Sequence, residues 1–184
     1  MYFVNDDRFE GEYKDDLING KGVCFYANGD RYEGEYKDDA LVGIAIYYYA
    51  NGNRYEGEWK NSMKNGKGIF YYANGEKYFG EWRDNQKDGF GSYFFPNRTR
   101  YEGEFKNDKR NGKGAFYFAN GNVYIGDWKE DKENGKGIFY LNVGPWRGDR
   151  HEGEWKDGKL NGKGAYFAKG KKLDGFWLNG KLIN

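Results

Sequence analysis

Asn51-Gly52-Asn53-Arg54-Tyr55-Glu56-Gly57-Glu58-Trp59 is the stretch that decides the fold. Asn-Gly favours the positive φ angles of a two-residue hairpin turn, so it predicts a tight turn before an extended strand. Because side chains alternate across a strand, Tyr55, Gly57 and Trp59 share one face, and the charged residues between them share the other. The stretch therefore predicts a turn followed by a strand with one aromatic face.

The same unit recurs along the chain. The glycine between the two aromatic positions stands at Gly11, Gly34, Gly57, Gly80, Gly103, Gly126, Gly153 and Gly175. The step is 23 residues five times, then 27 and 22. A second glycine marker, in Asn-Gly-Lys-Gly stretches, places the same four-residue insertion between Gly137 and Gly153. Two markers with one period predict a repeat protein.

The aromatic-x-Gly-acid-aromatic pattern resembles the MORN repeat (membrane occupation and recognition nexus). It stands at Phe9–Tyr13, Tyr32–Tyr36, Tyr55–Trp59, Tyr78–Trp82, Tyr101–Phe105, Tyr124–Trp128, His151–Trp155 and, in degenerate form, Leu173–Trp177. We expect one array over residues 1–184, with units starting near 9, 32, 55, 78, 101, 124, 151 and 173. The resemblance implies an elongated, twisted antiparallel sheet with an aromatic groove.

The residues themselves predict the same fold class. Each unit has room for two short strands, such as Arg54–Trp59 and Gly68–Tyr72, with a wider connection over residues 60–66 and an Ala-Asn-Gly turn. No window shows the 3.6-residue apolar period of a helix. Short strands with regular turns predict an all-β meander of about eight consecutive hairpins. The glycine between two aromatic residues leaves space for a ring to lie over the strand.

Composition bounds the class of protein. A mean hydropathy of −1.10 is typical of disorder, but 21% aromatic residues and a net charge of +1 oppose it. The aromatic residues must therefore supply the core. Cys24 is the sole cysteine, and no apolar stretch approaches the roughly 20 residues of a membrane span. Without a signal-peptide pattern at the start, we expect a reducing, cytoplasmic setting.

Enzyme chemistry has little basis in the sequence, and we expect no catalytic residue, cofactor or metal. His151 is the only histidine and occupies a repeat aromatic position, so a structural ring is the simpler interpretation. One Cys and one His cannot form a familiar zinc site. Ser62 and Ser92 lack the context of an activated nucleophile. The Glu-Gly-Glu pairs recur in most units, which indicates a solvated, ion-paired face rather than catalytic carboxylates.

The aromatic positions admit two interpretations, a core or a ligand contact. A single-layer sheet cannot bury both of its faces, which predicts a partner over part of the aromatic surface. The first hypothesis is thus a non-catalytic scaffold whose groove takes an amphipathic helix or a peptide. The resemblance implies a cytoskeletal, ciliary or motor-associated partner. The predicted groove residues are Tyr32, Tyr36, Tyr55, Trp59, Tyr78, Trp82, Tyr101, Phe105, Tyr124, Trp128 and Trp155.

Three departures from the repeat predict local individuality. Leu41-Val-Gly-Ile-Ala45 replaces an Asn-Gly-Lys-Gly stretch, and Pro96-Asn97-Arg98 replaces Ala-Asn-Gly, so that turn must change. The insertion over residues 142–150 puts Trp146 at a turn, outside any repeat position. Trp146 and Arg147 are the predicted specificity loop.

Charge is uneven, and it keeps two alternatives open. Residues 1–60 hold 7 basic and 13 acidic residues, net −6, and the remainder holds 23 and 16, net +7. A peripheral membrane protein could bind acidic phospholipids through the basic edge, and two copies could pair as a homodimer through opposite ends. Near-neutral charge disfavours nucleic acid. The predicted lipid contacts are Lys106, Lys109, Arg110, Lys113, Lys129, Lys132, Lys136, Lys156, Lys159 and Lys163.

Overall fold

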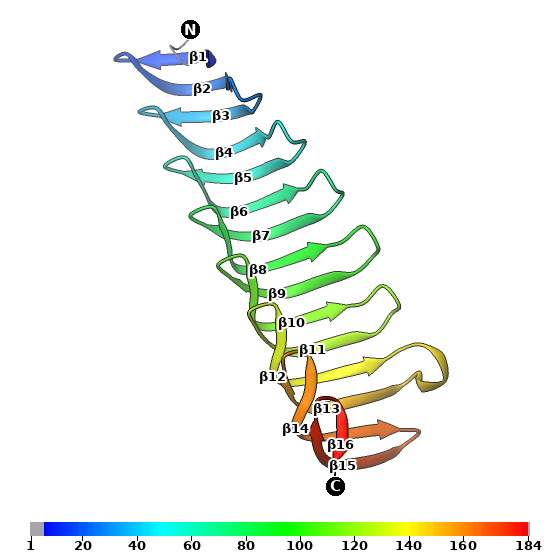
Figure 1. Cartoon of the computed structure of the whole chain (residues 1–184). Helices are drawn as coiled ribbons and strands as arrows, with labels where there is room; N and C mark the ends of the chain where they lie inside the picture. Colours follow the sequence, from blue (N-terminus) through cyan, green and yellow to red (C-terminus); the bar gives the residue numbers. More distant parts are fainter. Residues whose placement is uncertain (1–5, 184) are drawn as a thin grey trace. The chain divides into compact units, whose positions relative to one another are not determined.

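The computed structural model describes residues 6–183, which form sixteen strands paired in sequence order in one antiparallel sheet (Figure 1). The strands are β1 (Arg8–Lys14), β2 (Leu17–Phe25), β3 (Arg31–Lys37), β4 (Ala40–Tyr48), β5 (Arg54–Lys60), β6 (Met63–Tyr71), β7 (Lys77–Arg83), β8 (Gln86–Phe94), β9 (Arg100–Lys106), β10 (Lys109–Tyr117), β11 (Val123–Lys129), β12 (Lys132–Leu141), β13 (Asp149–Lys156), β14 (Lys159–Ala168), β15 (Lys171–Leu178) and β16 (Lys181–Ile183). A 3₁₀ turn, η1 (Gly144–Trp146), follows β12. The predicted all-β meander of hairpins is confirmed.

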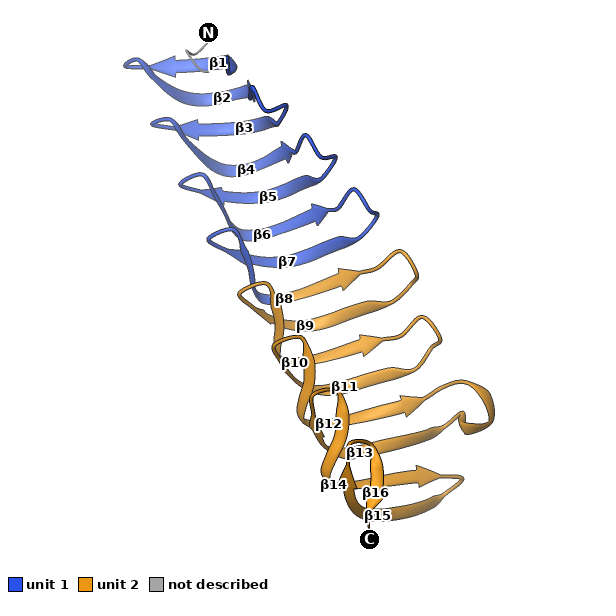
Figure 2. Cartoon of the chain, viewed as in Figure 1, with its two compact units in different colours: residues 1–89 blue, residues 90–184 orange. Residues whose placement is uncertain are grey.

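The chain forms two compact units (Figure 2). The first extends to Gly89 and the second begins at Phe90, both inside β8. Each unit is described by itself below. The odd-numbered strands β1 to β13 carry the aromatic-x-Gly-acid-aromatic pattern, with His151 at the first aromatic position of β13, and most even-numbered strands carry the Gly-Lys-Gly pattern, from which β4, β8 and β16 depart.

Glycines face one another across neighbouring strands and make room for a ring. In the first unit Gly57 pairs with Gly68, and Gly68 pairs with Gly80. The Tyr55 side chain is 0% exposed, and a Cβ added at Gly68 would lie 2.3 Å from its hydroxyl oxygen. That hydroxyl donates to the Glu58 carbonyl at 3.1 Å. The ring therefore lies over bare backbone, as the sequence predicts.

The second unit repeats this arrangement. Gly114 pairs with both Gly103 and Gly126, and the Tyr101 hydroxyl lies 2.3 Å from where a Cβ of Gly114 would stand. The Tyr101 hydroxyl donates to the Glu104 carbonyl at 3.0 Å. We call the sheet face that carries these tyrosines the ring face, and the other the ladder face.

The two kinds of turn are the reverse of the prediction. The expected wider connection is a two-residue turn, because Asn61 and Ser62 alone separate β5 from β6, with φ of 49° and 59°. These values are typical of a type I′ hairpin turn. The Asn-Gly turn instead lies within a longer connection, in which the Gly52 N–H donates to the Tyr49 carbonyl at 2.9 Å. Asn and Asp tolerate positive φ, so a two-residue turn can form without glycine. The prediction assigned the tight turn to Asn-Gly and was therefore wrong.

Within each unit, side chains also join one repeat to the next at both sheet edges. At the long turns the Asn53 amide oxygen accepts from the Ala73 N–H at 2.8 Å. The Asn122 amide oxygen likewise accepts from the Asn142 N–H at 3.0 Å. At the short turns the Ser62 hydroxyl accepts from the Leu41 N–H at 3.1 Å. Backbone groups beside the turns are thereby satisfied without a ladder partner.

The prediction that the turn at Pro96-Asn97-Arg98 must change is wrong, because this sequence keeps the hydrogen bond of the other repeats. The Arg98 N–H donates to the Phe95 carbonyl at 3.2 Å, as Gly75 does to Tyr72 at 3.0 Å. Arg98 has a φ of 69°, where the equivalent Gly75 has 86°. An arginine therefore occupies a backbone position that the repeat fills with glycine.

Replacing Arg98 by glycine is expected to stabilise the second unit by about 0.5–1 kcal/mol. A non-glycine residue in the left-handed region costs roughly 1–2 kcal/mol. Glycine avoids this cost, but its greater freedom in the unfolded chain offsets part of the gain. Denaturant unfolding followed by tryptophan fluorescence measures the difference. The matched reverse change, Gly75→Arg, should destabilise, and equal effects of the two substitutions would contradict this account.

Candidate functional site

Ten of the eleven predicted groove residues form the core and are not accessible in the single chain. Their exposed fractions are Tyr32 0%, Tyr36 4%, Tyr55 0%, Trp59 7%, Tyr78 0%, Trp82 5%, Tyr101 0%, Phe105 5%, Tyr124 0% and Trp128 3%. Trp155 is half-buried. Edge-to-face contacts join the rings, as between Tyr55 and Trp59 at 5.3 Å and between Tyr55 and Trp82 at 5.3 Å. These residues form the buried layer of the ring face.

A second set of rings, which the prediction missed, lies beside this core. In the first unit Tyr47, Tyr49, Phe70 and Tyr72 follow one another with ring-centroid distances of 4.5, 5.5 and 4.5 Å. Tyr49 and Tyr72 are half-buried. Burial raises the pKa of Tyr49 to about 12, so its hydroxyl is neutral at physiological pH. We call these four rings the ring row of the first unit, and they form a continuous aromatic strip.

The second unit has its own ring row. Phe95, Phe116, Phe118 and Phe139 lie at successive centroid distances of 6.3, 4.7 and 5.6 Å, and all four are half-buried. The signal in the sequence was an aromatic residue directly before each Ala-Asn-Gly sequence or its Pro-Asn-Arg equivalent, at a 23-residue step. It stands at Tyr26, Tyr49, Tyr72, Phe95 and Phe118.

A cation lies on the aromatic strip of each unit. The Lys64 ammonium is 4.9 Å from the Phe70 ring centroid and 4.6 Å from that of Trp82. In the second unit Arg110 takes the same place, 5.2 Å from Phe116 and 4.5 Å from Trp128. Cation–π contacts of this kind hold the long side chains against the rings. Arg110, a predicted lipid contact, is thus committed to the ring face.

The ladder face carries a repeated triplet of one arginine, one glutamate and one aromatic ring. Arg54 pairs with Glu56 at 2.9 Å, and its guanidinium carbon lies 4.4 Å over the Tyr71 ring. The same triplet recurs around Arg31, Arg100 and Arg150. The carboxylates are thus ion-paired on this face, but these partners lie two residues away on the same strand and not across strands as the Glu-Gly-Glu pairs predicted. Apolar residues interrupt the ladder and are exposed, Ile44 by 80% and Phe79 by 52% in the first unit.

Ion pairs occupy several of the predicted lipid-binding residues. Lys109 pairs with Glu130, Arg110 with Asp131, Lys113 with Asp127 and Lys132 with Asp157. Burial favours a higher pKa for the Asp127 carboxyl, but bonds from Lys113 and from the Lys136 N–H hold its pKa below the usual value. The remaining predicted lysines are exposed on the second unit. The predicted specificity residues Trp146, 58% exposed, and Arg147 lie at η1.

His151 takes the place of the buried tyrosine in its repeat. Its ring stacks on Tyr166 at 4.6 Å and meets Trp177 edge-on at 5.4 Å. Its Nδ1 atom is buried with no hydrogen-bond partner. Burial lowers the pKa of His151, and the nearby Asp149 carboxylate opposes this only in part. Neutral His151 thus serves as a ring, as the sequence predicts.

The second unit should lose stability as the pH falls through about 6.5. His151 binds a proton more weakly in the folded chain than in the unfolded chain, whose pKa is near 6.5, so protonation favours unfolding. The full contribution is present above that pH. Denaturant unfolding about one pH unit either side of 6.5 measures the loss, because carboxylates titrate well below this window. His151→Phe should abolish the dependence, and a dependence that persists would contradict the assignment.

Two features are absent from residues 6–183. No group of three or more His, Cys, Asp and Glu side chains there is placed to hold a metal ion. That part of the chain also contains no helix long and apolar enough to cross a bilayer.

Comparison with known proteins identifies the family. The MORN repeat family model matches residues 9–31, 32–54, 55–77, 78–100, 101–123, 124–144 and 151–172, so the chain belongs to the MORN repeat family. No curated protein sequence matches it significantly.

Two solved structures are similar in fold. One is the SAS-4 (dCPAP) TCP domain of Drosophila melanogaster in complex with a proline-rich motif of Ana2, with 17% identity, a TM-score of 0.54, and coverage of 95% of this chain and 92% of that chain. The other is the TCP10 domain of Danio rerio CPAP, with 15% identity, a TM-score of 0.56, and coverage of 96% and 82%. At these identities the likeness concerns the fold.

Proposed function

We propose that this protein is a non-catalytic interaction scaffold, and that its ring rows bind an extended, proline-rich peptide of a partner protein. The observation that carries the proposal is the strip of rings Tyr49, Phe70 and Tyr72, whose centroids lie 5.5 and 4.5 Å apart and of which Tyr49 and Tyr72 are partly accessible. Aromatic-lined grooves dock proline-rich segments because the polyproline II helix is already extended and loses little entropy on binding.

Two further points support a peptide partner. The aromatic strip recurs in both units, so a long segment could use either one. A protein of similar fold is known in complex with a proline-rich motif. An amphipathic helix is the competing occupant, and a cytoskeletal, ciliary or motor-associated partner remains part of the proposal from the family resemblance.

A membrane surface has less support. Four of the ten predicted lipid contacts are held in ion pairs with acidic residues. An anionic headgroup would have to compete with those carboxylates, and the bilayer would have to approach both signs of charge together. A homodimer has no supporting observation in the single chain.

The test compares neighbouring rings that point to opposite faces of the sheet. In the ring-face variant Tyr49, Tyr72, Phe95 and Phe118, which directly follow β4, β6, β8 and β10, are all changed to alanine. In the matched control Tyr48, Tyr71, Phe94 and Tyr117, the last residues of the same strands, which alternate to the ladder face, are changed instead. We expect a fluorescent polyproline II peptide to bind the ring-face variant at least about tenfold more weakly, equivalent to about 1.4 kcal/mol.

The control variant should bind as the unchanged protein does. Thermal unfolding of both variants shows whether each remains folded. Equal weakening in the two variants would contradict the assignment of the binding face. Binding of a synthetic amphipathic helix in place of the polyproline II peptide would leave the scaffold function but overturn its proposed ligand.

A further inference from the structure

The ladder face of the second unit carries a trough that the proposed function does not use. Two cavities of about 650 and 450 Å³ lie there, and both are lined by Glu152, Gly153 and Lys163. Together they extend from Ile125 on β11 to Phe176 on β15. Because they share lining residues, they form one depression across five strands, at about 4.8 Å per strand spacing or about 19 Å in all.

Two cations in this trough have no carboxylate partner within ion-pair distance in residues 6–183. They are Lys136 and Lys163, and both are exposed. At the equivalent place in the preceding even strand, Lys113 pairs with Asp127. The Lys163 position faces Phe176 instead, because the last repeat has phenylalanine where the others have an acidic residue. Its ammonium lies 6.0 Å from that ring's centroid, at the outer limit of a cation–π contact.

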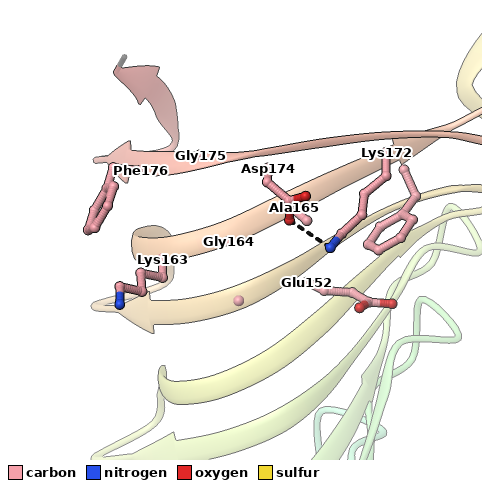
Figure 3. Close-up of a pocket in the computed structure, with 10 residues that line it drawn as sticks. Glu152, Lys163, Gly164, Ala165, Lys172, Asp174, Gly175 and Phe176 are labelled. Carbon is pink, nitrogen blue, oxygen red and sulfur yellow. Dashed lines mark ion pairs between the residues drawn. The ribbon is translucent and has the colours of Figure 1, made fainter.

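The carboxylates around the trough are engaged elsewhere. Glu152 pairs with Arg150, and Asp174 pairs with Lys172 at 2.8 Å. Glu154, opposite Lys136, accepts from the Lys163 backbone N–H at 2.9 Å. Figure 3 shows Lys163 and Phe176 at one end of the larger cavity, away from the Lys172–Asp174 pair. The Glu154 carboxylate keeps its charge, because a backbone N–H is neutral, so the lining groups outside ion pairs, Lys136, Lys163 and Glu154, carry a net charge of +1.

Apolar surface accompanies this charge. Ile125 is 46% exposed and Phe176 is 55% exposed, while Ile138 and Ala165 line the cavities between them. Phe176 stands where the other repeats have an acidic residue, and Ile125 where all of them but the Phe79 repeat do, so the ladder is interrupted at both ends of the trough. An occupant that covers these side chains removes apolar area from water while its charge meets the lysines.

We propose that this trough binds a second, acidic peptide segment in an extended conformation. Lys136 and Lys163 lie two strand spacings apart, on β12 and β14, or about 9–10 Å. Three residues of polyproline II chain advance about 9.3 Å and return to the same side of that helix. The matching ligand therefore carries acidic side chains at positions i and i+3, with apolar residues between them, over about six residues.

The test uses synthetic fluorescent peptides of this design and the complete chain. A peptide with acidic residues at i and i+3 should bind more tightly than a peptide of the same composition with the two acids adjacent. Lys136→Glu together with Lys163→Glu should weaken binding at least tenfold, and a peptide with lysines at i and i+3 should restore it. Lys129→Glu with Lys156→Glu makes the same charge change outside the cavity lining and should leave binding intact.

Phe176→Glu supplies the acidic residue that the other repeats have at this place. It should pair with Lys163 and weaken the acidic peptide severalfold while the chain remains folded. The alanine variant of the ring face should bind this peptide normally, which separates failure of this site from failure of the proposed function. Equal binding of the two acidic peptides, equal loss in the control reversal, or binding of anionic vesicles without peptide binding would overturn the proposal.

Discussion

Gly68→Val is expected to cost about 3 kcal/mol in the free energy of unfolding of the first unit. A Cβ at this position would lie 2.3 Å from the Tyr55 hydroxyl oxygen and 2.5 Å from ring carbons Cε2 and Cζ. Tyr55 cannot yield easily, because its ring is fully buried between Trp59 and Trp82. Overpacking of a tight core typically costs about 1–3 kcal/mol, and a β-branched residue here belongs at the upper end.

The control lies one residue away on the same strand. Lys67→Val introduces the same side chain on the ladder face, where position 67 is exposed, and should change stability by less than about 0.5 kcal/mol. A double-mutant cycle with Tyr55→Ala tests the mechanism, since removal of the ring should relieve the clash and make the two costs clearly non-additive. Strictly additive costs would show that the valine is harmful for another reason.

Tyr124→Ala is expected to have the largest effect of all, a loss of about 3–5 kcal/mol from the second unit. The ring is 0% exposed and meets Trp128 and Trp155 edge-on at 5.4 and 5.0 Å. Its removal leaves a cavity over Gly126 and Gly137 that glycine backbone cannot fill. Denaturant unfolding followed by tryptophan fluorescence measures the loss directly.

Tyr124→Phe provides the matched comparison. It keeps the ring and removes only the hydroxyl, which donates to the Asp127 carbonyl at 3.1 Å. We expect a cost of about 1 kcal/mol, the usual contribution of one hydrogen bond. If the phenylalanine variant were as unstable as the alanine variant, the ring over the glycines would not be the main source of stability.

The fold could be predicted because its determinants are local and repeated. A fixed 23-residue step, with glycines between aromatic residues, allows few arrangements other than consecutive hairpins with rings over bare backbone, and Tyr55 over Gly68 shows this arrangement. The predicted turn lengths were wrong because the tight turn was expected only at Asn-Gly, whereas Asn61 and Ser62 form a two-residue turn with positive φ and no glycine. Turn type depends on strand register, which sequence alone does not display.

The candidate site was harder to predict than the fold. Alternation places Tyr55 and Phe70 on one sheet face, but it does not say which rings the neighbouring repeats cover. Coverage follows from the glycine pairing, which draws the tyrosines of β3, β5, β7, β9 and β11 fully inside and leaves Tyr49 and Tyr72 half-buried. Likewise, Lys163 is uncommitted only because Phe176 is its cross-strand neighbour, a relation that depends on register.

The most direct test of the scaffold is an NMR titration of the folded protein, labelled on its aromatic side chains, with a polyproline II peptide. The account predicts that ring signals of Tyr49, Tyr72, Phe95 and Phe118 shift on binding. Those of the buried core rings Tyr55, Tyr78, Tyr101 and Tyr124 should change little. Shifts confined to ladder-face rings such as Tyr48 and Tyr71, or no shifts at saturating peptide, would contradict it.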